Sequence, residues 1–281
     1  MTISRYTGLS LTEIYKRHTI IRPISYEEFF KKFDILYGIK WDEDKLYNSI
    51  LDVTSEIKDD ACSGALISVS IDKYYMAGME IKQILNTFRQ ARKDAYAPID
   101  YLLSLRYDSS QAMTKILTDY VSLHDDIFQV FEGVDLVGNE KEMPRNNLNE
   151  FINPWRTHNK IIRAHVGEYG EEEHIAYAVR SLKITRIAHG FCVKDPNIIE
   201  EIKDKNIPLD ICISSNFLTK NIKHVIDHPL KKLVSHGLRI TLGTDDPTVF
   251  NTDMSKELRY CKLLLGDGFE NFYMRLCHET Y

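Results

Sequence analysis

The chain has 281 residues, of which 43% are hydrophobic and 27% charged, and its formal net charge is −5. This balance is that of a globular protein and excludes disorder over most of the length. Acidic and basic residues are mixed without a basic stripe, which excludes nucleic acid as a partner. No apolar run approaches the ~18 residues of a membrane span, and residues 1–18 lack the apolar core of a signal peptide. We therefore expect a cytoplasmic protein with no membrane contact.

The cysteines are five in number and scattered along the chain. No two of them have the spacing of a metal knuckle or of a redox pair. We expect reduced thiols in or near the core.

The N-terminal part of the chain is predicted to be helical. Leu11–His18 has a helical pattern, and we expect His18 to be exposed on it. Ser25 and Glu28 have the spacing of a capping box, which predicts a helix over Tyr26–Leu36.

Seven short apolar runs are typical of β-strands, because they are partly β-branched and bounded by polar residues or glycine. They are Ala65–Ile71, Tyr101–Leu105, Phe131–Leu136, Lys160–His165, Ile184–His189, Leu209–Ile213 and Arg239–Leu242. Helical patterns lie between them, at Met76–Lys93, Ser110–Leu123, Glu171–Leu182, Pro196–Lys205 and Pro229–His236. Asp195 is a good N-cap for the fourth of these helices, since proline follows at the first helical position.

Strand–helix alternation of this kind predicts an α/β protein with a parallel sheet and helices outside it. A TIM-type (β/α)8 barrel and a doubly wound open sheet both fit. Polar residues recur where the predicted strands end, at Gly138, His165, His189, Ser214–Asn216 and Asp245–Asp246. Because a barrel gathers its chemistry at the carboxyl ends of many strands, this recurrence favours the barrel, as a single domain over residues 1–281.

Two strand ends carry residues suited to a catalytic zinc. Imidazole and carboxylate are ligands of such a site, which makes His165 and Asp245 candidates. Glu168 follows His165 after Gly167, and in a closed pocket its carboxyl group would act as an acid near neutral pH. The alternative is that Glu168 belongs to the acidic first turn of the next helix.

The other candidates are His189 and the Asp245–Asp246 pair. His189 would serve as a base or charge stabiliser beside a metal-bound water, and the alternative is a buried histidine bonded to the backbone. The adjacent carboxylates are expected to diverge on an extended segment, one toward metal and one toward substrate. A plain Asp-Asp-Pro turn is the alternative. The remaining histidines at 174, 224, 228 and 236 are expected to be solvated.

Five ordered motifs, GVDLVGNE (133–140), HVGE, RIAHG, SSN and LGTDDP, resemble the adenosine deaminase family of metal-dependent hydrolases. The likeness covers roughly residues 60–277 and implies a hydrolase of purine metabolism with the barrel fold of that family. It further implies that His165 and Asp245 bind zinc, that Glu168 gives a proton to purine N1, and that His189 holds or deprotonates the attacking water.

The same resemblance assigns the substrate contacts. Asp246 would bond purine N7 and help to orient the water, and the backbone of Gly138 would meet N3. Water would then add at C6 and ammonia would leave. Ser215 and Asn216 match a family motif whose role we take as structural.

The first family motif is missing. The family opens with His-x-His-Leu-x-Gly on its first strand, which gives two more zinc ligands, and no His-x-His occurs in this sequence. The best match, ISRYTG (3–8), aligns Gly8 with the motif's glycine and puts Ile3 and Arg5 at the ligand positions, where neither can bind zinc. This match predicts a short, weak first strand. Three explanations stay open: a divergent chain without the zinc site, a site with fewer ligands or with ligands from a partner chain, or a wrong alignment.

Two functions follow from these patterns. The first is hydrolytic deamination of an adenine nucleoside or nucleotide to the inosine form by a zinc-activated water. The alternative is a catalytically silent protein that binds purine nucleoside or acts as an assembly or regulatory subunit. The sequence does not decide between nucleoside and nucleotide, or between a homo- and a hetero-oligomer.

Overall fold

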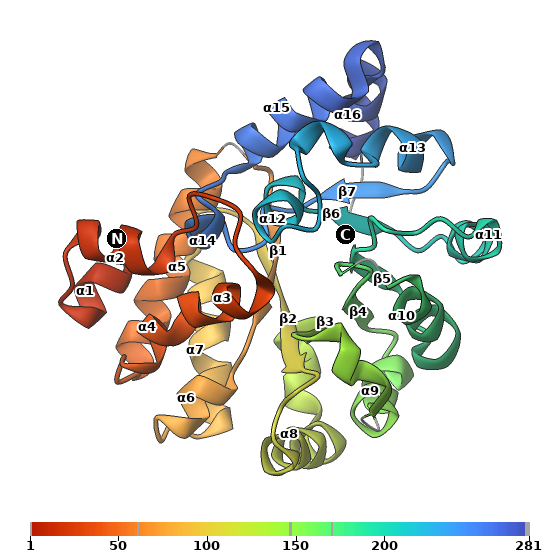
Figure 1. Ribbon diagram of the computed structural model, residues 1–281. Coiled ribbons are helices and arrows are strands. Elements are labelled where there is room, and N and C mark those ends of the chain that lie inside the picture. The colour runs from red at the N-terminus through yellow and green to blue at the C-terminus, as the bar shows by residue number, and fades with distance from the viewer. Residues whose placement is uncertain (1, 61, 146–147, 170, 279–281) are drawn as a thin grey trace.

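Seven parallel strands form one curled sheet in the computed structural model, which describes residues 2–60, 62–145, 148–169 and 171–278. The strands follow chain order around the curl (Figure 1). They are β1 (Ala65–Val69), β2 (Ile99–Arg106), β3 (Phe131–Val137), β4 (Ile161–Val166), β5 (Arg186–His189), β6 (Leu209–Ile211) and β7 (Ile240–Leu242).

The predicted strands are confirmed, each with bounds that shift by no more than two residues. Each strand pairs in parallel with the next one along the chain. The α/β barrel-type architecture is therefore confirmed as a curled half-barrel of seven strands. Among the described residues, no pairing joins β1 to β7.

The expected first strand is wrong. Thr2–Thr7 is helix α1, which contacts helices α2, α4 and α5 and lies outside the sheet. Gly8 has a φ of 71°, and its N–H donates to the carbonyl of Ser4. A left-handed glycine ends a helix in this way, so the glycine that matched the family motif is a helix stop here.

Helices occupy the rest of the described chain. Before β1 lie α1, α2 (Leu11–His18), α3 (Tyr26–Phe30), η1 (Lys31–Phe33), α4 (Asp34–Tyr37) and α5 (Glu43–Asp59). Between β1 and β5 lie α6 (Asp72–Met76), α7 (Ile81–Asp94), α8 (Gln111–Leu123), η2 (Asp125–Gln129), η3 (Glu140–Arg145), α9 (Asn149–Thr157), α10 (Glu172–Tyr177) and the π-helical turn η4 (Ala178–Leu182). After β5 lie α11 (Pro196–Asp204), α12 (Ile213–Leu218), η5 (Val225–Asp227), α13 (Leu230–Ser235), α14 (Pro247–Phe250), α15 (Met254–Leu265), η6 (Gly266–Gly268) and α16 (Phe269–His278).

Local sequence explains several helix boundaries. Ser25 and Glu28 form the predicted capping box, and Asp195 caps α11 through the N–H of Asn197. Met76–Lys93 was expected as one helix, but Gly78 has a φ of 97° and separates α6 from α7. Tyr26–Leu36 likewise divides into α3, η1 and α4.

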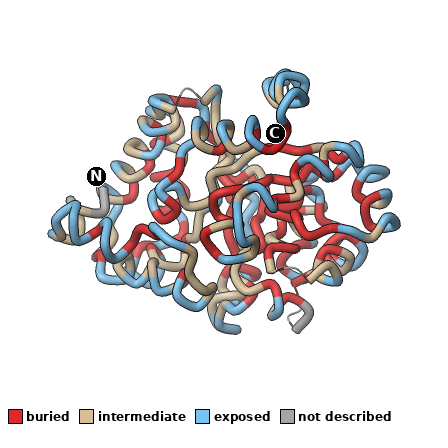
Figure 2. Tube along the Cα trace, turned by 45° about the horizontal axis from the view of Figure 1, so that its top comes forward, coloured by how far each residue is buried: buried red, intermediate tan, exposed pale blue. Residues whose placement is uncertain are grey.

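The core lies between the strands and the surrounding helices, as the buried stretches in Figure 2 show. A smaller apolar cluster joins α3 to the loops and short helices after β6 and β7, through Ile20, Phe29, Leu218, Val249 and Phe250. Two backbone hydrogen bonds join the same segments. The N–H of Ile20 donates to the carbonyl of Val249, and the N–H of Ile24 donates to the carbonyl of Leu218. The chain before β1 is thereby fixed over the carboxyl ends of the strands.

His18 differs from expectation, because it is buried with 3% of its surface exposed. Its Nδ1 lies 2.7 Å from the carbonyl oxygen of Lys32, which ties the end of α2 to η1. The five cysteines are free thiols, and Cys192, Cys212 and Cys261 are buried as expected, whereas Cys277 is exposed and lies away from the core. None of the described helices combines the length and the apolar character that crossing a bilayer requires.

Candidate functional site

A cavity of about 330 Å³ lies at the carboxyl ends of the strands. All six residues that the sequence singled out for chemistry or substrate contact line it, namely Gly138, His165, Glu168, His189, Asp245 and Asp246. Aromatic side chains of α3, η1 and α4 form part of its wall, at Tyr26, Phe29, Phe30, Phe33 and Tyr37. The cavity therefore combines a polar floor with an apolar side, as ligand sites commonly do.

His165 lies at the centre of the polar floor. Its Nε2 is 3.1 Å from Oδ2 of Asp135, and its Nδ1 is 3.3 Å from Nε2 of His189. Burial acts to lower the pKa of His165, but the charge of Asp135 and the hydrogen bond to it outweigh burial and raise the pKa.

Asp135 is a functional residue that sequence reasoning missed. It is fully buried on β3, and its Oδ2 accepts hydrogen bonds from Arg163 at 2.6 Å and from Ser68 at 2.6 Å. Although burial acts to raise the pKa of Asp135, Arg163 and His165 hold it well below its usual range. The signal was present, because Asp135 stands in the motif GVDLVGNE, from which only Gly138 was taken.

Glu168 and His189 face each other across the cavity, with 3.8 Å between Oε2 and Nε2. Burial, with the charge of Asp245 added, raises the pKa of Glu168 well above its usual value. Burial lowers the pKa of His189 to about 4. The raised pKa of Glu168 favours its protonated form, and the lowered pKa of His189 favours its neutral form.

The turn that carries Glu168 is held by Glu140, another buried residue that was not predicted. The backbone N–H groups of Gly167, Glu168 and Tyr169 all donate to its carboxylate, at 2.6, 3.1 and 2.8 Å. Gly167 has a φ of 67°, and a Cβ there would lie 2.5 Å from Ile175. The turn thus needs glycine for both conformation and space.

Asp245 and Asp246 do not diverge, so that expectation is wrong. Asp245 has a φ of 54°, which turns the backbone, and the two carboxyl groups hydrogen-bond each other. Burial and the charge of Asp245 raise the pKa of Asp246. Asp245 also acts electrostatically on His165, His189 and Glu168, which places its charge near all three.

Two histidines expected to be solvated are not. His228 is buried, and its Nε2 lies 3.3 Å from Oδ1 of Asn216. His174 is half-buried, and its Nδ1 lies 3.4 Å from the carboxylate of Glu140. His224 and His236 are exposed, as expected.

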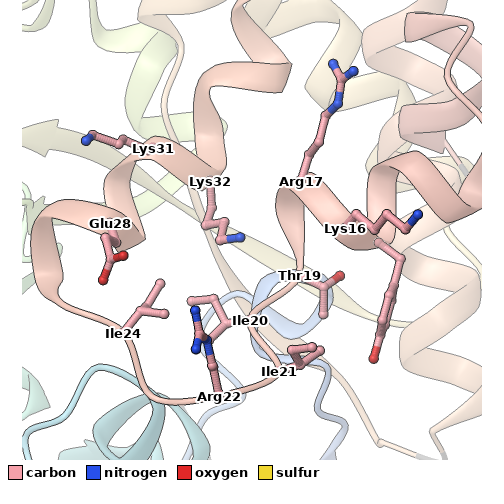
Figure 3. A pocket seen from close by; sticks show the side chains of 11 residues that line it. Lys16, Arg17, Thr19, Ile20, Ile21, Arg22, Ile24, Glu28, Lys31 and Lys32 are labelled. Atoms are coloured by element: carbon pink, nitrogen blue, oxygen red, sulfur yellow. The ribbon is translucent and has the colours of Figure 1, made fainter.

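A second hollow of about 460 Å³ lies between α2 and α3, away from the histidines and carboxylates of the first. Figure 3 shows its lining, which includes Lys16, Arg17, Arg22, Lys31 and Lys32 around Ile20, Ile21 and Ile24. None of the residues predicted for chemistry lines it.

The donor atoms fit a zinc ion by their chemistry. Single donor atoms of His165, Glu168 and His189 lie within 4.8 Å of one another, and Asp245, whose charge acts on His165, lines the same cavity. Imidazole and carboxylate are zinc ligands, and catalytic sites use about three of them. Among the described residues, His165 and His189 are the histidines that line the cavity.

Fold and site together define a barrel-type α/β protein with an imidazole and carboxylate centre at the carboxyl ends of its strands. The sequence profile described as "Adenosine deaminase" matches residues 10–274. The chain belongs to the adenosine deaminase family.

Curated relatives agree with this assignment, and solved structures agree with the fold. Adenosine deaminase of Clostridium kluyveri is 28% identical over 84% of this chain and 69% of its own length, and that of Enterococcus faecalis is 27% identical over 82% and 69%. Adenine deaminase of Arthrobacter aurescens superposes with a TM-score of 0.77 at 16% identity, covering 94% of this chain and 82% of its own. N6-methyl-AMP deaminase of Arabidopsis thaliana superposes with a TM-score of 0.76 at 22% identity, covering 94% of this chain and 80% of its own.

Proposed function

We propose that the protein hydrolytically deaminates an adenine nucleoside or nucleotide to the inosine form, with a zinc ion held by His165 and Asp245. The observation that carries the proposal is the convergence of a buried acid with a raised pKa, a buried imidazole with a lowered pKa and a pair of carboxyl groups in one cavity. The named relatives act on adenosine, adenine or N6-methyl-AMP. Zinc, when bound, supplies a Lewis acid that makes water a nucleophile near neutral pH.

Glu168 supplies the proton that the reaction needs. Addition of water at C6 of the purine places negative charge on the ring nitrogen N1, and a protonated carboxyl group there neutralises it. Because burial raises the pKa of Glu168, the group keeps its proton to a higher pH than an exposed carboxyl group does, which suits it to act as the acid.

The remaining residues orient the reactants. His189 faces the same space as Glu168 and holds the water. Asp246, protonated because its pKa is raised, donates a hydrogen bond to purine N7. Gly138 has a φ of 91°, lines the cavity, and presents backbone to N3 without a side chain in the way.

The test combines metal analysis with a turnover assay. We expect zinc in the purified protein by mass spectrometry and loss of adenosine absorbance on incubation. Glu168→Gln should lower kcat by about 10²–10⁴-fold, since an amide cannot supply the proton. Glu173→Gln, an exposed acid in the helix that follows the same turn, is the matched control and should retain activity. Unchanged kcat in Glu168→Gln would refute the acid assignment.

A second candidate, a catalytically silent purine-binding or assembly subunit, has one observation in its favour. The segment aligned with the family's first-strand motif is helix α1, so it brings no ligand to the cavity. High zinc affinity depends on a nearly complete ligand set. The silent function predicts no zinc and no turnover, while adenosine still raises the melting temperature by binding the folded state.

A further inference from the structure

A line of hydrogen bonds leads from the first residue of α13 to the imidazole of His189. It begins at the backbone N–H of Leu230, which donates to Nδ1 of His228 at 3.1 Å. A backbone N–H is a donor only, so Nδ1 of His228 is an acceptor and carries no proton. Burial lowers the pKa of His228 to about 4, so the ring is neutral and its single proton lies on Nε2.

The next bond fixes the orientation of the Asn216 amide. Nε2 of His228 lies 3.3 Å from Asn216, and because this nitrogen is the donor, the atom facing it must be the amide oxygen Oδ1. The NH₂ group of Asn216 then faces the other way, toward Nδ1 of His189 at 3.4 Å. The oxygen and the NH₂ group of an asparagine amide are usually hard to tell apart in a structure. Here the backbone N–H of Leu230, which can only donate, determines through His228 which of the two faces which neighbour.

The third bond fixes His189. Its Nδ1 accepts a hydrogen bond from the NH₂ group of Asn216, so this nitrogen carries no proton and the ring is neutral. The proton of the neutral ring therefore lies on Nε2, the nitrogen that faces the cavity, 3.3 Å from His165 and 3.8 Å from Glu168. His228, Asn216 and His189 expose 4%, 0% and 1% of their surfaces, so water does not compete with these bonds.

We propose that Asn216 and His228 are positioning residues that fix His189 in the tautomer with its proton on Nε2, so that His189 enters the reaction as a hydrogen-bond donor. His189 then holds the water oxygen by its N–H and does not remove a proton through that nitrogen. This consequence for the water rests on the proposed deamination, whereas the tautomer itself does not. Asn216, taken from the sequence as structural, and His228, expected to be solvated, thus gain a role in the site.

Nuclear magnetic resonance of protein labelled with ¹⁵N-histidine tests the tautomer directly. Long-range ¹H–¹⁵N spectra near neutral pH distinguish a protonated from an unprotonated ring nitrogen, and the signals of residue 189 are those lost in His189→Asn. In the wild type we expect the proton of His189 on Nε2. Asn216→Asp should move it to Nδ1, because a carboxylate only accepts hydrogen bonds. The matched control Ser215→Ala, whose buried hydroxyl has no hydrogen-bond partner among the described residues, should leave the tautomer unchanged.

A wild-type spectrum with the proton on Nδ1 would overturn the proposal, and so would an unchanged tautomer in folded Asn216→Asp. Should that variant fail to fold, as circular dichroism would show, the wild-type spectrum alone decides. Turnover adds a second readout, in which Asn216→Asp lowers kcat by at least about tenfold with little change in KM, and Ser215→Ala changes neither. Absence of turnover in the wild type would refute the proposed deamination and leave the tautomer result standing.

Discussion

Strands β4 and β1 belong to the same sheet but differ in how many strands they pair with and in how far their residues are buried. β4 pairs with a strand on each side, whereas β1 pairs with β2 alone among the described residues. The polar side chains of β4, Arg163 and His165, are both bonded to buried Asp135. Every residue of β1 is at least partly exposed. Ser68 of β1 also bonds Asp135, but it is an exposed residue, whereas the buried charged pairs of the sheet lie on its middle and later strands.

The largest loss of unfolding free energy should come from removing the carboxylate of Asp135, which bonds both polar side chains of β4. Asp135→Ala removes the carboxylate partner of His165 and one of the two carboxylate partners of Arg163, which keeps Asp210, and should cost about 3–5 kcal/mol of unfolding free energy. Urea denaturation of the wild type and the variant measures this loss of unfolding free energy. Asp100→Ala on β2 is the control, because its pair with Arg92, 3.8 Å apart, is half-exposed and should cost only about 0–1 kcal/mol. Equal losses of unfolding free energy in the two variants would contradict the expected difference between buried and exposed polar positions.

A matched pair of isoleucines compares the two strands directly. Ile162 on β4 is buried, and Ile67 on β1 is partly exposed. Ile162→Ala should cost about 2–5 kcal/mol, because it leaves a cavity among packed neighbours. Ile67→Ala should cost about 1 kcal/mol, since much of that side chain already meets water. A larger loss at Ile67, measured by the same denaturation, would mean that the edge is as firmly packed as the centre.

The smallest effect concerns the dependence of stability on pH around the turn after β4. Burial raises the pKa of Glu140 to about 7, above the usual value near 4.5. The folded state therefore holds this proton more tightly than the unfolded state, and the stability it contributes is present at low pH and is lost as pH rises from about 5 to 7.

In Glu140→Gln that loss, of order 2 kcal/mol or less, should shrink because the amide does not titrate. Thermal unfolding at several pH values measures this loss, with Glu173→Gln, an exposed acid of α10, as the control. An unchanged pH profile in Glu140→Gln would show that Glu140 is ionised across this range in the folded protein.

The sequence predicted the strands well because each is a short apolar run between polar boundaries, a signal that is local. It also identified His165, Glu168, His189 and Asp246 as cavity residues, since each stands where a strand or its turn ends. Asp135, Asn216 and His228 were missed or misjudged because their roles depend on partners far along the chain. The strand expected at ISRYTG (3–8) was wrong because it rested on alignment to a motif, whereas these residues form a helix that ends at Gly8.

The exposed edge of β1 has a consequence for handling the protein in solution. Ala65–Val69 is apolar apart from one serine and carries no charge or proline, the features that usually protect an edge strand. Among the described residues no strand pairs with its other edge, and an unpaired edge of this kind is a template for pairing between molecules. Concentrated samples should therefore lose monomer with time, and low concentration or mild denaturant should slow that loss.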